Sequence, residues 1–74
     1  MAIHIGKLIN EKLIEKNETP SWLAQQMGRS IKEVQRILSK PSINTGDLDI
    51  ISEILNVNFF MYYQAEVEEY LSKA

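Results

Sequence analysis

Cysteine is absent from this 74-residue chain, and histidine occurs once, at His4. Without cysteine, neither a disulfide framework nor a thiolate metal site can stabilise the fold, and one histidine cannot build a metal site with nearby ligands. No run approaches the ~20 apolar residues of a membrane-spanning helix, and the N-terminal residues mix charges and lack the apolar segment of a signal peptide. We therefore expect a cytoplasmic protein with no metal, no cofactor and no membrane association.

Groupings of catalytic side chains are also absent. The sequence shows no Ser–His, Cys–His or His-rich combination, no glycine-rich phosphate loop and no cluster of metal ligands. The acidic run Glu66, Glu68 and Glu69 fits a solvated helix face, and a single domain of this length leaves little room for a concave pocket. The sequence therefore predicts that the protein is not an enzyme.

The net charge of −2 is unevenly distributed along the chain. Residues 1–19 are balanced, residues 20–40 carry a net +3, and residues 41–74 carry a net −5. The positive segment contains four cationic residues, Arg29, Lys32, Arg36 and Lys40, and one acidic residue, Glu33. Such asymmetry orients a protein on a polyanion even without net attraction, and the small number of cations predicts modest non-specific affinity.

Apolar residues recur at three- and four-residue spacings through most of the chain, and no alternating run is bounded by turn residues. The pattern predicts an all-α fold of five helices, over about residues 3–16, 20–27, 31–38, 46–55 and 58–72. The expected N-caps are Thr19 before Pro20, Ser30 and Thr45. Glu33 lies three residues after Ser30, which predicts a capping box.

Residues 20–39, PSWLAQQMGRSIKEVQRILS, carry the residue pattern of a helix-turn-helix. Apolar side chains fall where two short crossed helices must bury them, Ala24 falls where the helices come closest, and Gly28 falls at a turn that needs a positive φ. The apolar positions are Leu23, Met27, Val34 and Ile37. A unit of this kind presents its second helix outward, usually into the major groove of DNA.

Four segments together resemble the Cro/cI-like (XRE-type) family of bacterial and phage repressor domains. They are IGKLINEKL, WLAQQMG, SIKEVQRIL and PSINTGDLDIISEILNV, and the resemblance covers about three quarters of the chain. The FF.YY tail that follows is similar to that of short stand-alone regulators of Bacteroides type. The resemblance implies a compact five-helix bundle of lambda-repressor-like type, with residues 1–58 as the DNA-binding domain and 59–74 as a C-terminal aromatic and acidic helix.

The resemblance also implies sequence-specific binding of duplex DNA by a small transcriptional regulator, in most members a repressor that acts as a homodimer on a near-palindromic operator. Residues 31–38 would be the recognition helix. The implied base-reading candidates are Ile31, Lys32, Glu33, Gln35 and Arg36. The implied phosphate-binding candidates are Thr19, Ser21, Arg29, Ser30 and Lys40.

Several of these positions allow two interpretations. Arg36 could read guanine or hold a phosphate, and Glu33 could accept from cytosine or serve only as a cap. Family members usually carry a small aliphatic residue directly after the turn glycine, where this chain has Arg29, so Ile31 could fill that place in the core instead of facing DNA. Two further departures are Leu13, where an arginine is usual, and Pro20, where glutamine often contacts phosphate.

The C-terminal helix repeats large apolar residues at three- and four-residue steps, which is the pattern of a surface that packs on another helix. The residues at its start could belong to the core of the monomer, whereas those beyond it favour a homodimer contact. The dimer-contact candidates are Tyr63, Val67, Tyr70 and Leu71. A second hypothesis for function uses the same surface, in a protein-interaction module or antitoxin-like protein that binds another chain.

Overall fold

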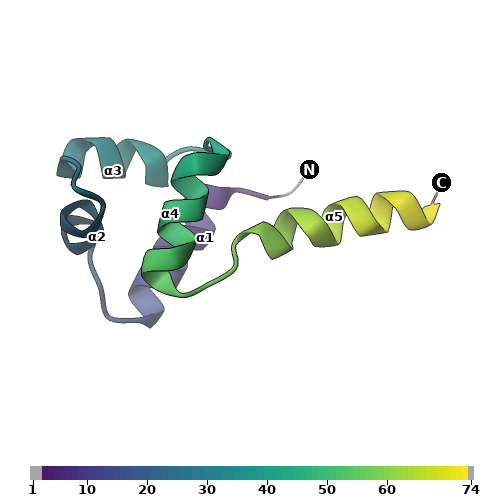
Figure 1. Cartoon of the computed structure of the whole chain (residues 1–74), viewed down its shortest axis with the longest axis horizontal. Helices are drawn as coiled ribbons and strands as arrows, with labels where there is room; N and C mark the ends of the chain where they lie inside the picture. Colours follow the sequence, from purple (N-terminus) through teal and green to yellow (C-terminus); the bar gives the residue numbers. More distant parts are fainter. Residues whose placement is uncertain (1–2, 74) are drawn as a thin grey trace.

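Figure 1 shows the computed structural model of the chain, which describes residues 3–73. Five helices follow one another, α1 (Ile5–Glu15), α2 (Pro20–Met27), α3 (Ile31–Leu38), α4 (Thr45–Leu55) and α5 (Phe60–Lys73). No strand occurs among the described residues, and no helix there is long and apolar enough to span a membrane. The prediction of an all-α fold with five helices is confirmed, and the helix ends lie within two residues of those expected.

Helices α1 and α2 each begin after an N-cap residue whose side chain accepts a hydrogen bond from a backbone N–H of the first turn. His4 is extended, and its Nδ1 accepts a hydrogen bond from the Lys7 N–H at 3.1 Å, so α1 begins at Ile5, two residues later than the apolar pattern predicted. Thr19 caps α2 as predicted, because its Oγ1 accepts from the Trp22 N–H at 3.0 Å while Pro20 occupies the first helical position.

The N-terminal caps of α3 and α4 each differ in a detail from the prediction. Ser30 caps α3 by accepting from the Glu33 N–H, but the Glu33 carboxylate accepts from the Ser30 hydroxyl at 3.2 Å, so the expected reciprocal bond to the backbone of Ser30 is replaced by a side-chain contact. The prediction that Thr45 caps α4 is wrong. Asn44 is the N-cap, since its extended backbone lets Oδ1 accept from the Asp47 N–H at 2.7 Å, and Thr45 is the first helical residue.

Helices α1 to α4 and the residue before α5 enclose one hydrophobic core. Helix α3 packs against both α2 and α1, and α2 also packs against α4. The fully buried side chains come from every element of this body, so the core ties together segments from both ends of the sequence. They are Ile5, Ile9, Leu13, Leu23, Val34, Ile51 and Phe59, with Leu55, Ala24, Leu48 and Ile37 nearly as buried.

A close backbone approach fixes the segment that follows α3. The free N–H groups at the start of α1 donate to this segment, Ile5 to the carbonyl of Pro41 at 2.9 Å and Gly6 to that of Lys40 at 3.0 Å. A Cβ atom on Gly6 would lie only 2.3 Å from the carbonyl oxygen of Leu38. Glycine at position 6 therefore allows the end of α3 and the connector to lie directly on α1.

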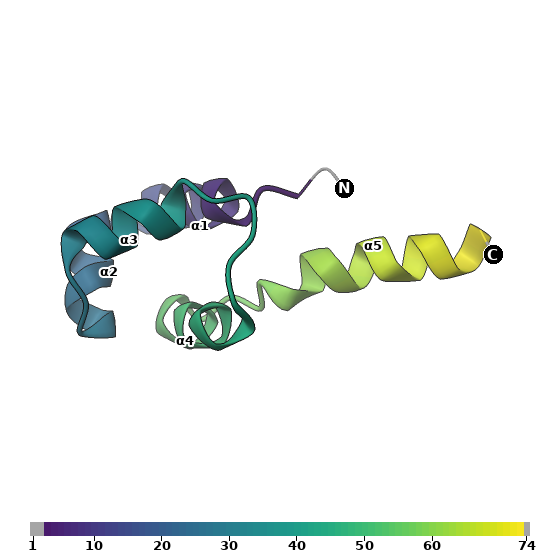
Figure 2. The same cartoon turned by 90° about the horizontal axis from the view of Figure 1, so that it is seen from above.

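Helix α5 extends away from this body, on the side opposite α2 (Figures 1 and 2), and gives the molecule its extents of 43 × 20 × 18 Å. None of its residues is buried. Phe59 anchors the segment before the helix in the core, and Phe60, Tyr62 and Tyr63 pack partly against that core. No hydrophobic side chain of α5 after Tyr63 is among those packed against the core, and Val67, Tyr70 and Leu71 are exposed, so the apolar repeat divides between a packed base and an exposed end.

Candidate functional site

The unit of α2, the turn and α3 (residues 20–38) is built around the small residues expected from the sequence. Ala24 is 2% exposed where the two helices meet, and Leu23 and Val34 are fully buried beside it. Gly28 adopts φ 68° and ψ 34°, the left-handed conformation predicted for the turn, and the following residue closes the turn by donating its N–H to the Ala24 carbonyl at 2.9 Å. Figure 1 shows α2 close to end-on beside α3, so the helices cross.

The outer face of α3 carries polar and cationic side chains. Because successive residues of a helix are 100° apart, burial of Val34 and Ile37 directs Lys32, Gln35 and Arg36 away from the core. All three are exposed. Ile31 is 47% exposed, so it does not fill the core position after the turn and stays at the edge of this outer face. We call Ile31, Lys32, Gln35 and Arg36 the α3 outer face.

The cations of this region differ in their partners. None of Lys32, Arg36 and Lys40 takes part in an ion pair within residues 3–73, and all three are exposed. The ion pairs in that part of the chain are Lys12–Glu15, Arg29–Asp47 and Lys73–Glu69. Three cations at and just beyond α3 are thus available to an anionic ligand without the loss of an internal salt bridge.

Arg29 has a different environment from the one the sequence suggested. Its guanidinium forms a two-pronged ion pair with Asp47 of α4, with Nη1 donating to Oδ2 at 3.0 Å and Nη2 donating to Oδ1. The side chain of Asn44 donates to the same carboxylate at 3.0 Å. Arg29, expected as a free phosphate contact, therefore ties the turn before α3 to the first turn of α4.

The environment of Asp47 favours its charged form. The residue is only 8% exposed, and the hydrogen bonds from Arg29 hold the pKa of its carboxyl below the ordinary value of 3.8, against the opposing effect of burial. The same hydrogen bonds raise the pKa of Arg29. The sequence did not identify Asp47 as the partner of Arg29, because 18 positions separate the two residues and they meet only in the folded chain.

The other polar candidates surround the start of α2 and α3. Ser21 is exposed, and Thr19 and Ser30 are exposed N-caps whose oxygens accept backbone N–H groups. Glu33 is exposed as well, but its carboxylate accepts from the Ser30 hydroxyl, which favours the capping role over base reading. At the start of α2, Pro20 has no N–H and the N–H groups of Trp22 and Leu23 donate to Thr19, so the hydroxyls of Thr19 and Ser21 are the donors that this end of the helix can offer to a ligand.

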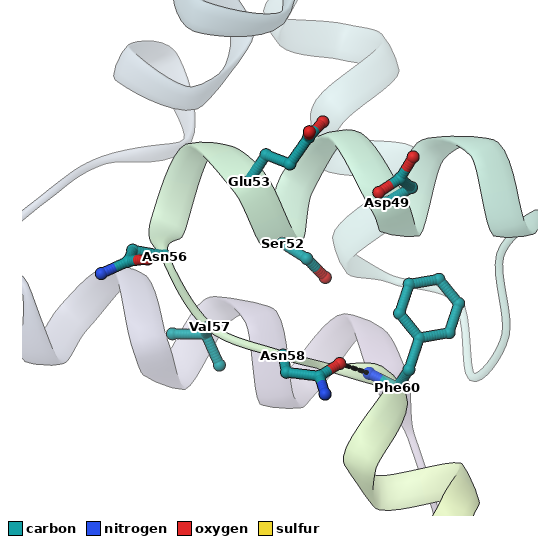
Figure 3. A pocket seen from close by; sticks show the side chains of 7 residues that line it. All are labelled: Asp49, Ser52, Glu53, Asn56, Val57, Asn58 and Phe60. Atoms are coloured by element: carbon teal, nitrogen blue, oxygen red, sulfur yellow. Dashed lines mark hydrogen bonds between the residues drawn. The ribbon is translucent and has the colours of Figure 1, made fainter.

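A cavity of about 310 Å³ lies elsewhere on the molecule, where the end of α4 meets the start of α5 (Figure 3). Its lining is Asp49, Ser52, Glu53, Asn56, Val57, Asn58 and Phe60. Among residues 3–73 no group of three histidine, aspartate or glutamate side chains is placed to hold a metal ion. The α3 outer face, by contrast, presents exposed polar and cationic side chains on a helix whose other side is anchored in the core, and it is the candidate site.

Comparisons of the chain with models of known families, with curated proteins and with solved structures find no match. The function must therefore be argued from side chains and their surroundings. The decisive feature is a short helix that buries Val34 and Ile37, and exposes amide and cationic groups with no internal ion pair.

Proposed function

We propose that this protein binds duplex DNA in a sequence-specific manner and acts as a small transcriptional regulator, in the manner of a repressor. The observation that carries the proposal is the α3 outer face, whose polar side chains are exposed while the opposite face of the same short helix is anchored in the core. A helix of this diameter fits the major groove of B-form DNA, where base edges present distinct donors and acceptors. The proposed arrangement is lambda-repressor-like, with α3 as recognition helix.

Each residue of the α3 outer face suits a particular contact. Arg36 can donate two parallel hydrogen bonds to O6 and N7 of guanine, and the Gln35 amide can pair with N6 and N7 of adenine. Lys32 supplies a point charge to guanine or to a phosphate. Ile31, exposed at the start of the helix, suits the methyl group of thymine.

The flanking groups suit phosphates rather than bases. The hydroxyls of Thr19 and Ser21 can donate to phosphate oxygens, as can Lys40 from the connector after α3. Ser30, a candidate from the sequence, is left out because its hydroxyl already donates to the Glu33 carboxylate. Arg29 is left out of this set, since its guanidinium is engaged with Asp47. We propose instead that Arg29 positions α3 against α4 before DNA arrives.

A pair of chains would compensate for the weak DNA binding that is expected from the modest positive charge of one chain. One copy carries a net −2 and offers few unpaired cations near α3, so it would neutralise few phosphates. Two copies joined rigidly bind two half-sites with a large gain in effective concentration. We therefore propose a near-palindromic operator with half-sites about one helical turn apart.

Selection from a random duplex library at about 100 mM salt tests this function, since phosphate-dependent affinity varies steeply with salt in that range. The proposal predicts enrichment of a two-fold-symmetric site. The double variant Lys32→Ala/Arg36→Ala should lose the enrichment, whereas Lys7→Ala/Lys16→Ala, an equal change of charge on exposed positions of the α1 region, should keep it. Failure of the wild-type chain to enrich any sequence would overturn the proposal.

A further inference from the structure

Arg29 and Asp47 form the contact that joins the turn before α3 to α4. Arg29 directly precedes Ser30, the N-cap of α3, and its side chain is 33% exposed. Asp47 lies in the first turn of α4 and is buried. The guanidinium is therefore partly open to solvent beside the start of the proposed recognition helix, although its charge is held by a carboxylate that is largely covered.

The carboxylate of Asp47 faces more than one cation. It accepts two hydrogen bonds from the guanidinium of Arg29 and one from the Asn44 amide at 3.0 Å. The hydrogen bonds from Arg29 are the main cause of the lowered pKa of Asp47, and the charge of Lys40 lowers that pKa further by a smaller amount. Lys40 forms no ion pair within residues 3–73, so it acts on this carboxylate only at longer range. One buried carboxylate thus compensates Arg29 directly and Lys40 in part.

Arg29 would be a strong phosphate ligand if Asp47 did not hold it, since a guanidinium presents a planar fork of donors that matches a phosphate group. The exchange of Asp47 for a phosphate is unfavourable in the folded chain. It would leave a buried carboxylate without its partner, which is costly, whereas the neutralisation of one phosphate changes the affinity by only about threefold between 50 and 200 mM salt. Arg29 therefore stays on Asp47 when the chain meets DNA.

We infer that Asp47 withholds Arg29 from the phosphate backbone and thereby limits the part of DNA binding that does not depend on sequence. This role rests on the proposed function, and it regulates the same surface. Contacts with phosphates carry no sequence information, so a released Arg29 would raise the affinity for every duplex without changing the bases that the α3 outer face reads. With Asp47 in place, three cations of this region that are unpaired within residues 3–73 remain for DNA, namely Lys32, Arg36 and Lys40.

The salt dependence of binding to an unrelated duplex tests this role. Asp47→Asn keeps the size of the side chain and an oxygen that can accept from Asn44, but it releases the charge of Arg29. The slope of the association constant against salt, in log–log form, should become steeper by about 0.9 for each chain bound. The affinity at 50 mM salt should rise by about threefold or more, because one further phosphate is neutralised. Circular dichroism at a temperature well below the melting point should show the helix content of the wild type.

Asp49→Asn is the matched control, because it removes the same charge two residues further along α4. Asp49 is exposed and forms no ion pair within residues 3–73, so its loss releases no cation and should change the slope far less. The double variant Arg29→Gln/Asp47→Asn removes both charges of the pair and should have the wild-type slope. This double variant also tests the role independently of Asp47→Asn, since a shallower slope would mean that Arg29 already contacts a phosphate in the wild-type chain.

Three results overturn the inference and leave the proposed function standing. Asp47→Asn could keep the wild-type slope, Asp49→Asn could steepen the slope as much as Asp47→Asn, or the double variant could have a shallower slope than the wild type. A double variant with a slope as steep as that of Asp47→Asn would also reject Arg29 as the released cation. A wild-type chain without salt-sensitive binding to any duplex would instead reject the proposed function, and this role of Asp47 with it.

Discussion

Helices α3 and α5 are both amphipathic, but they leave opposite faces exposed. Helix α3 buries its apolar side, with Val34 fully covered, and leaves an uncovered polar surface. Helix α5 has no buried residue and leaves its apolar side uncovered, with Val67 53% exposed. The difference shows that one amphipathic helix can bury its apolar side within the monomer and leave a polar side to solvent, whereas another leaves its apolar side to solvent.

The largest loss of stability is expected from a substitution at Gly6, where α1 lies directly against the end of α3. Gly6→Ala should lower the free energy of unfolding by about 3 kcal/mol or more, because the new Cβ would lie 2.3 Å from the Leu38 carbonyl oxygen and push α3 away from α1. Urea denaturation measures it. Gly46→Ala is the control, since its Cβ would meet only Asn44 Oδ1 at an ordinary 3.4 Å, and it should be neutral or slightly stabilising. Equal losses from both variants would contradict the close approach.

Two valines sharpen the comparison between α3 and α5 directly. Val34→Ala should cost about 2 kcal/mol of unfolding free energy, since two buried methyl groups are removed and a cavity remains. Val67→Ala should change the stability of the monomer by less than about 0.5 kcal/mol, because the side chain is half exposed. Thermal denaturation at concentrations below the dimer dissociation constant separates the two. Similar losses would mean that α5 packs in the monomer after all.

The α3 outer face should affect DNA binding without affecting stability. Arg36→Ala should weaken binding to the selected site by about 1–3 kcal/mol and relax selection at one base pair, if the guanidinium reads guanine. Fluorescence anisotropy against the selected site and single-base variants measures both quantities. A uniform loss across all sequences would reassign Arg36 to a phosphate.

The Arg29–Asp47 pair predicts a smaller effect that depends on pH. Because the pKa of Asp47 is lower in the folded state than its ordinary value of 3.8, its contribution to stability is present above that pH and declines as pH falls below it toward the folded pKa. Asp47→Asn should therefore lower the melting temperature by a few degrees at pH 7, and its difference from the wild type should shrink below pH 4. A difference that stays constant between pH 7 and pH 3 would remove the ion pair as its cause.

The sequence predicted those features that depend on local patterns. Helical spacing, the caps Thr19 and Ser30, and the left-handed turn at Gly28 all follow from residues close together in the chain, and the structure contains them. Asn44 was missed as a cap because Asn44 and Thr45 are both good N-caps, and only the backbone decides between adjacent candidates.

Features that depend on tertiary contact could not be predicted in the same way. Gly6 looks like an ordinary helical glycine until the connector after α3 is seen to lie on it, and Arg29 meets Asp47 across 18 positions of sequence. The apolar repeat of α5 left open whether it packs inside the monomer. The structure divides it, with Phe59 in the core and Tyr70 outside.

The salt dependence of duplex binding tests the central claim most directly. Fluorescence anisotropy of a labelled selected duplex should give an association constant that falls as salt rises from 50 to 200 mM, with a slope in log–log form of about −0.9 for each phosphate neutralised. Lys40→Ala should make that slope shallower by about one, because its ammonium no longer neutralises a phosphate, and should leave sequence preference unchanged. The absence of salt-sensitive binding to any duplex, including the promoter region of its own gene, would contradict the assignment of α3 as a DNA-reading helix.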